Sequence, residues 1–346
     1  MKNAYHILSD VHFAWTKESR KNYTQEVLQV FDKLNEISNE NANKGYNNIL
    51  ILLGDFFDRG FSDSNDAMTA LEFCRMIFSG FDNVYAVVGN HELTYYKNNP
   101  FWFMVTRIDD ANLMKQNTKM NQPRGFSDFI KIKDWFRDGE VAFLFNHFGT
   151  SIKRTIPECH INIGFFHQNI GSKDIPGIWG DYVDIEGHND LAAYNYLFLG
   201  HIHSNSYYGK YKLSSCGVAY FLSSLVRTSV ADIDDNYLER NIPVIKVIDG
   251  QFETVEDNLF YLMPRKDCIV EEIVQANKLA REKLEKRKEI FSSEVTGSSL
   301  YELALANAKV AGVDSLFDLL LQPFETIKNE YVLLLSELKG DSDDGD

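Results

Sequence analysis

The sequence predicts an α/β fold, because short apolar runs that end in polar residues alternate with segments that carry an apolar stripe at helical spacing. Residues 4–9 form a strand-like run that ends at Asp10, and residues 48–53 form a second run that ends at Gly54 and Asp55. Between the two runs, apolar side chains recur with helical spacing at Val27, Val30, Phe31, Leu34 and Ile37. Such alternation is typical of a mainly parallel sheet whose polar strand ends lie on one edge.

The same alternation continues after Asp55. A second helix is indicated by the apolar stripe of Met68, Leu71, Cys74, Ile77 and Phe78. Residues 83–88 predict a third strand, which ends at the sequence Gly-Asn-His-Glu. Further strands are predicted at residues 141–145, 161–166 and 196–199. The last of them ends at Gly200, where a glycine lets the backbone turn sharply as it leaves the sheet.

From about residue 214 the pattern changes to strands alone, and we expect these strands to form a second sheet. The hairpin signal Asp249-Gly250 separates two of them. The strands are predicted at residues 218–222, 243–248 and 251–259.

After Pro264 the sequence becomes helical in pattern and highly charged. This shift predicts one domain over residues 1–264 and a helical C-terminal extension over residues 265–340. The acidic residues 341–346 are expected to be a disordered tail.

Composition narrows the function classes. The net charge of −15 argues against broad, non-specific attraction to nucleic acid, which needs clustered Lys and Arg. It does not exclude nucleic acid as a substrate, because two divalent cations in a site would add about +4 and reverse the local field. The four scattered cysteines and the absence of a signal-peptide pattern predict a cytoplasmic protein, and no run approaches the roughly 18 apolar residues of a membrane span.

Each of five predicted strands is followed by a polar motif. Gly-His-Ile-His, residues 200–203, is the most suggestive, because His201 and His203 would point the same way in an extended chain and could reach one metal ion. A pair of loop histidines without a ligand is an equally common reading of that motif alone. The other motifs are Asp-Val-His at 10–12, Gly-Asp-Phe-Phe-Asp-Arg-Gly at 54–60, Gly-Asn-His-Glu at 89–92 and Phe-Phe-His-Gln-Asn at 165–169.

Over residues 4–262, the order of these motifs resembles that of the calcineurin-like metallophosphoesterases, whose pattern is DxH, GDxxD, GNH[DE], H and GHxH. The resemblance implies a four-layer αββα sandwich of two mixed sheets with two metal ions at the strand ends. One ion would be held by Asp10, His12, Asp55 and His203. The other would be held by Asp55, Asn90, His167 and His201, so that Asp55 bridges the pair.

Mixed imidazole and carboxylate ligands suit Mn²⁺, Fe or Zn²⁺ better than Mg²⁺, and we expect two Mn²⁺ ions. Two ions about 3.5–4 Å apart can activate water as the nucleophile and stabilise charge that develops on a phosphate. His91 has no metal in this scheme and is expected to stabilise or protonate the leaving oxygen, with Asp58 orienting it.

Three further residues have two possible interpretations. His147 also follows a predicted strand and competes with His167 for the ligand position, although His167 ends the longer apolar strand. His6 lies inside a strand, where a hydrogen-bonded core histidine is expected. Arg59 could contact a substrate phosphate through both guanidinium nitrogens, or it could be a solvated turn residue.

Within the superfamily, Phe-Phe-His-Gln-Asn, Gly-His-Ile-His and Phe-Leu-Ser-Ser-Leu-Val-Arg-Thr-Ser at 221–229 look most like the nuclease branch. That branch includes the SbcD subunit of bacterial SbcCD and the double-strand-break repair nucleases of archaea, eukaryotes and phages. The resemblance implies a DNA exonuclease or endonuclease in repair or recombination, whose C-terminal extension docks on an SMC-type ATPase (SbcC-like). A homodimer contact through the helices after the first two strands is a separate possibility.

Two alternatives remain at this stage. Gly-Asp-Phe-Phe-Asp-Arg-Gly together with Gly-Asn-His-Glu is also similar to Ser/Thr protein phosphatases, which lack Gly-His-x-His, and a small-molecule phosphoesterase belongs to the same group of readings. The third reading is an inactive scaffold of the same fold. The complete ligand set speaks against it, because converging buried polar groups are costly unless a cation pairs them.

Overall fold

The computed structural model describes residues 1–262, apart from residues 14–20, 59–63, 95–98, 110–128, 172–181, 186–187, 204–207, 214–216, 223 and 227–237. Arg59 and the predicted extension and tail, residues 265–346, therefore lie outside the described residues. The boundary near residue 264 stays a prediction.

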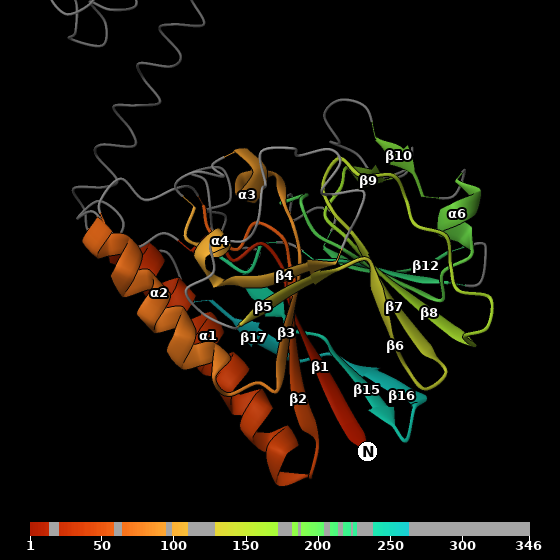
Figure 1. Cartoon of the computed structure of the whole chain (residues 1–346), viewed down its shortest axis with the longest axis horizontal. Helices are drawn as coiled ribbons and strands as arrows, with labels where there is room; N and C mark the ends of the chain where they lie inside the picture. Colours follow the sequence, from red (N-terminus) through yellow and green to blue (C-terminus); the bar gives the residue numbers. More distant parts are fainter. Residues whose placement is uncertain are drawn as a thin grey trace, which may run out of the picture. The chain divides into compact units, whose positions relative to one another are not determined.

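Two large mixed sheets form the centre of the described part (Figure 1). The first sheet has the order β16-β15-β1-β2-β3-β5-β4. Its strands are β1 (Lys2–Leu8), β2 (Asn47–Leu53), β3 (Asn83–Val87), β4 (Val105–Asp109), β5 (Ile130–Lys133), β15 (Val244–Ile248) and β16 (Gln251–Glu256). The second has the order β12-β13-β11-β8-β7-β6, built from β6 (Trp135–Asp138), β7 (Val141–Asn146), β8 (Ile161–Phe166), β11 (Tyr196–Leu199), β12 (Gly209–Lys212) and β13 (Val218–Phe221).

The remaining elements are short, apart from two long helices. The helices are α1 (Lys21–Asn43), α2 (Ser64–Phe78), α3 (Asn90–Thr94), α4 (Phe101–Met104) and α6 (Asn189–Ala192). Two small sheets pair β9 (Ile170–Gly171) with β10 (Val183–Asp184), and β14 (Glu239–Asn241) with β17 (Leu259–Tyr261). None of the helices in the described ranges combines the length and the apolar character needed to cross a lipid bilayer.

Alternation along the first strands separates two hydrophobic layers. Ala4 and Leu8 of β1 face α1 and α2, whose apolar stripes pack on that side of the first sheet. Met68, predicted to belong to the α2 stripe, is exposed instead. Tyr5 and Ile7 face the second sheet instead. Figure 1 shows α1 and α2 side by side along β2 and β3.

Stacked aromatic rings fill the space between the two sheets. The rings of Phe136 and Phe143 lie 4.7 Å apart and nearly parallel, and Phe165 and Phe198 stack at 5.5 Å. On the outer face of the second sheet, Leu191 of α6 belongs to a third apolar cluster with Leu144 of β7. The order of layers agrees with the predicted sandwich of two mixed sheets flanked by helical segments.

The predicted division of strands between the sheets is wrong in part. The strands after residue 214 do not form a second sheet of their own. Instead, β15 pairs antiparallel with β1, β16 extends the first sheet, and β13 joins β11 in the second. Strands β4, β5 and β6 were not predicted at all. The apolar pattern of a strand reports which of its faces are buried, but it does not identify the strand beside it.

Parallel pairing brings the motifs to one edge. β1, β2 and β3 run in the same direction, and so do β7, β8 and β11 in the other sheet. Within each sheet, the carboxyl ends of the parallel strands therefore deliver the loops that follow them to one edge, as the sequence predicts.

Candidate metal centre

The residues at the strand ends have an unusual backbone. Asp10, His12, Asp55 and His201 all have positive φ angles, of 46°, 46°, 44° and 80°. Such angles are uncommon outside glycine and persist only where the surroundings hold them. The loops after β1 and β2 hold one another, because the His12 N–H donates to the Asp55 carbonyl at 2.9 Å and the Asp58 N–H donates to the Phe13 carbonyl at 3.3 Å.

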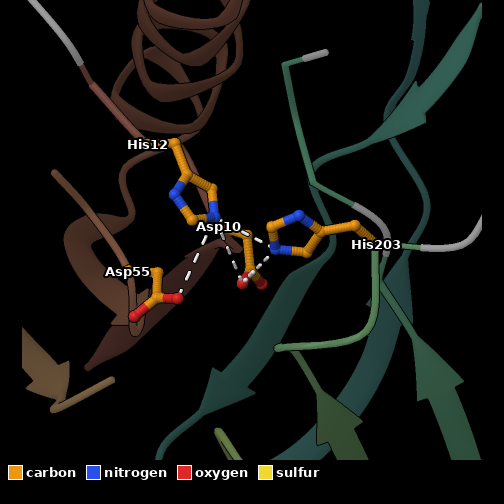
Figure 2. A group of neighbouring side chains, drawn as sticks. All are labelled: Asp10, His12, Asp55 and His203. Atoms are coloured by element: carbon orange, nitrogen blue, oxygen red, sulfur yellow. Dashed lines mark hydrogen bonds and ion pairs between the residues drawn. The ribbon is translucent and has the colours of Figure 1, made fainter. Parts of the chain in front are cut away.

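The first group of candidate ligands consists of Asp10, His12, Asp55 and His203, whose ligand atoms all lie within 4.8 Å of one another (Figure 2). His12 Nε2 lies 3.9 Å from Asp10 Oδ1 and 3.9 Å from Asp55 Oδ2. His203 Nε2 lies 3.3 Å from Asp10 Oδ1 and 3.0 Å from His12 Nε2. Two imidazole nitrogens and two carboxylates thus face one point, which is the donor set predicted for one ion.

The second group consists of Asp55, His167 and His201, with Asn90 beside it. His167 Nε2 lies 3.2 Å from Asp55 Oδ2 and 3.1 Å from Asn90 Oδ1. The other ring nitrogen of His167 donates to the Leu53 carbonyl at 2.8 Å, so the ring presents Nε2 to the cluster. Asp55 belongs to both groups, which is the arrangement expected of a bridging carboxylate.

Glu92 is a structural member of this site to which the sequence analysis gave no role. Its buried carboxylate accepts three backbone N–H groups at 2.9 Å each, from Asp55, Phe56 and Gly89. It therefore ties the loop after β2 to the loop after β3, and it fixes the backbone of Asp55. The only sequence signal for this role is that Glu92 ends the motif Gly-Asn-His-Glu. The sequence does not reveal which backbone groups Glu92 binds.

Two glycines are required where a side chain would collide with the site. Gly54 has a φ of +87°, and a Cβ there would lie 2.2 Å from His167 Nδ1. A Cβ on Gly200 would lie 2.6 Å from Asp10 Oδ2. The role expected for Gly200, a sharp turn, is thus secondary to leaving room for a carboxylate.

A family model described as calcineurin-like phosphoesterase matches residues 5–213. The chain belongs to this family. Membership points to a metal-dependent phosphoesterase, and the clustered His and Asp side chains could bind divalent metal ions. The nuclease branch of the family stays a prediction.

Among solved structures, this calcineurin-like phosphoesterase is similar to the 5'-nucleotidase precursor from Thermus thermophilus, at 11% identity and a TM-score of 0.38. The match covers 80% of this chain and 58% of that chain, so the chain spans a little over half the length of that protein. No curated protein sequence matches the chain.

The cluster is electrostatically coupled. Burial alone would raise the pKa of the Asp55 carboxyl, but the neighbouring charge of His167 lowers it to about 2. Burial would lower the pKa of His167, but Asp55 and Asp10 raise it to about 10. His12 and His201 have pKa values lowered to about 4, mainly by burial and then by the neighbouring histidines.

His91 stands at the border of the cluster. Its backbone N–H donates to Asp55 Oδ1 at 2.9 Å, and its Nε2 lies 3.9 Å from Asp55 Oδ2. Its Nδ1 contacts the backbone carbonyl of Asp58 and lies 3.9 Å from the Asp58 carboxylate. The ring is 26% exposed, which leaves it accessible to a substrate, and both the carbonyl and the carboxylate of Asp58 face it.

The structure separates His147 and His6 from the candidate ligands. His147 Nδ1 accepts a hydrogen bond from the Val88 N–H at 3.0 Å, whereas His167 lies in the second group. His6 is buried in the first sheet and hydrogen-bonded to Asn48 at 2.9 Å, the core environment expected for it. This geometry favours His167 over His147.

Proposed function

We propose that the protein is a two-metal phosphodiesterase that hydrolyses DNA. The observation that carries the proposal is the shared position of Asp55, whose carboxylate belongs to two adjacent groups of candidate ligands. Its Oδ2 atom faces both groups, because it lies 3.9 Å from His12 Nε2 and 3.2 Å from His167 Nε2. Paired metal sites of this kind are used for in-line displacement at phosphate.

The donor set supports Mn²⁺, with Fe or Zn²⁺ as alternatives, because imidazoles and carboxylates occur together in both groups. The first ion would be held by Asp10, His12, Asp55 and His203, and the second by Asp55, Asn90, His167 and His201. The close approach of two imidazole nitrogens at 3.0 Å, His12 Nε2 and His203 Nε2, is favourable only when a proton or a cation lies between them. Bound divalent cations would supply positive charge for the phosphate and activate water.

The chain's own residues would do the rest. His91 can donate a proton from Nε2 to the leaving oxygen, since its Nδ1 faces the Asp58 carbonyl and holds the other proton. Burial of Asp10, His12 and Asp55 excludes bulk water around the ligands, which strengthens their attraction for a cation.

DNA as the substrate class is supported by the sequence motifs at 165–169, 200–203 and 221–229. On the same ground we propose an SMC-type ATPase as a partner of residues 265–340, and a homodimer as a second mode of assembly. Removal of residues 265–346 should abolish co-purification with the ATPase while hydrolysis of a small diester remains. If the truncated chain co-purified with the ATPase as well as the full chain does, the partner proposal would be wrong. The substrate proposal would not be affected.

The substrate proposal is tested with the full chain and Mn²⁺ on three substrates: a labelled DNA oligonucleotide, bis-p-nitrophenyl phosphate and a phosphopeptide. Cleavage of the oligonucleotide and the diester, with an inactive Asp55→Asn variant as control, is the expected result. Hydrolysis of the phosphopeptide alone would favour the Ser/Thr phosphatase reading. No hydrolysis of any substrate, together with no bound metal, would favour an inactive scaffold.

A further inference from the structure

A third group of polar side chains lies beside the first group of candidate ligands. It consists of His12, Asp58 and His91, whose ligand-type atoms also lie within 4.8 Å of one another. Asp58 Oδ1 lies 3.9 Å from His12 Nδ1 and 3.9 Å from His91 Nδ1. The two imidazole rings meet edge to face, with centroids 4.8 Å apart. The Asp58 carboxylate therefore faces the Nδ1 atoms of both histidines.

The chemistry of the two rings argues against a third cation here. His12 presents Nε2 to Asp10, Asp55 and His203, and a neutral imidazole that binds a cation through Nε2 keeps its proton on Nδ1. His91 Nδ1 contacts the Asp58 carbonyl, which is an acceptor, so that nitrogen also carries a proton. A protonated nitrogen is a donor and not a ligand. Asp58 thus faces two N–H donors, which is the arrangement expected of a carboxylate that orients the two imidazole rings.

We infer that Asp58 is a positioning residue for His12 as well as for His91, and so connects the first metal group to the leaving-group side of the site. The inference rests on the proposed function, because it takes His12 as a metal ligand. Carboxylates that hold the far nitrogen of a ligating histidine fix its tautomer and orientation.

The backbone supports this placement independently. The Asp58 N–H donates to the Phe13 carbonyl at 3.3 Å, and the Phe13 N–H donates to the Phe56 carbonyl at 2.6 Å. Phe13 and Phe57 also form a β-bridge. These contacts align the stretch that carries His12 with the stretch that carries Asp58 beyond the ends of β1 and β2. The main chain therefore places Asp58 next to the stretch that carries His12, whatever the rotamer of His91.

A double-variant cycle tests the inference. Mn²⁺ affinity is measured by titration calorimetry for the full chain, Asp58→Asn, His12→Asn and the combination of the two. We expect Asp58→Asn to weaken binding at one of the two sites by roughly 10–100-fold in an otherwise unchanged chain, and to add little once His12 is replaced. A His91→Asn variant should retain the Mn²⁺ affinity of the unchanged chain.

Additive effects of Asp58→Asn and His12→Asn, or unchanged affinity in Asp58→Asn, would overturn the inference. An Asp138→Asn variant, which removes a carboxylate bonded to Asn3 and Tyr5, controls for loss of charge elsewhere. Failure of the proposed function would give a different result, because the Asp55→Asn variant would then still bind Mn²⁺. Thermal unfolding of the metal-free proteins shows whether any variant merely fails to fold.

Discussion

The strands β1 and β2 contribute to two contrasting regions: the core between the two sheets, and the edge at the carboxyl ends of the strands. Between the sheets, Tyr5 and Ile7 lie among stacked aromatic rings with regular strand geometry. Two residues beyond the strand ends, the chain adopts positive φ angles at Asp10 and Asp55, and carboxylates and imidazoles are buried there. Burial of apolar surface in the core stabilises the fold, whereas backbone strain and desolvation at the edge offset part of that stabilisation. Stability and chemistry are thus carried by adjacent parts of the same strands.

The largest effect expected at the edge follows from Asp55→Asn. This change removes the charge shared by both ligand groups while keeping the shape of the side chain. We expect loss of both metal ions and a fall in turnover of at least roughly 10³-fold. Elemental analysis and diester hydrolysis measure the two quantities. Retention of two metals per chain would contradict the role of Asp55.

His91→Asn should separate chemistry from metal binding. The ring is more exposed than those of His12 and His167 and faces Asp55 through Nε2 at 3.9 Å. Turnover should fall by roughly 10²–10⁴-fold while metal content is unchanged, since a general acid contributes about that much. A good leaving group such as p-nitrophenolate should reduce the loss. Metal loss in this variant would make His91 a ligand.

Glu92→Gln tests the connection between the two loops. The amide would set an N–H₂ group against one of the three backbone donors that Glu92 now accepts. We expect a loss of about 1–3 kcal/mol in the free energy of unfolding and a fall in metal affinity of roughly 10-fold or more. Chemical denaturation and metal titration measure these changes. Unchanged affinity with lowered stability would show that Glu92 supports the fold alone.

Phe143→Ala makes the opposite change. Phe143 is fully buried and stacks on Phe136 at 4.7 Å. Its truncation should cost about 3–5 kcal/mol of stability, while turnover per folded molecule and metal content stay nearly unchanged. The contrast between core and edge would be broken if this variant lost its metals under conditions where it remains folded.

The smallest effect concerns pH and His6, a buried histidine that belongs to the core and not to the site. Burial lowers the pKa of its ring to about 4, and the ring nitrogen that faces away from Asn48 has no hydrogen-bond partner in the described structure. The unfolded chain therefore binds more protons between pH 4 and pH 6.5, so stability is complete above that window and falls as pH decreases through it. This contribution is at most about 1.4 kcal/mol per pH unit.

A His6→Leu variant should lose that part of the pH dependence in denaturant unfolding curves. The difference between the two proteins isolates His6 from other groups that titrate in the same range. Parallel curves over the whole window would show that folding does not lower the pKa of His6.

The sequence predicts those features of the fold and the site that depend on neighbouring residues in the chain. The run at residues 48–53 predicts β2 nearly to the residue, because a short continuous apolar run and a terminal Gly54 are local signals. The convergence of Asp10 and Asp55 follows from the rule that parallel strand ends meet at one edge, because β1 and β2 are neighbours in one sheet. His12 and His203 follow strands of different sheets, so their approach depends on how the two sheets pack. The pairing of β15 with β1, the three donors on Glu92 and the approach of Asp58 to His12 were not predictable. Each depends on which distant segment the fold places alongside, and apolar periodicity does not encode that choice.

The antiparallel pairing of β1 with β15 has a consequence for the order of folding. Ala4 lies opposite Lys246, so the amino-terminal strand acquires its second neighbour only after nearly all of the described chain has been synthesised. Until then β1 has an open edge, which can pair with other chains. Contacts between residues so distant in sequence close slowly and late. The strand that leads to Asp10 is thus among the last of the described strands to be enclosed on both sides.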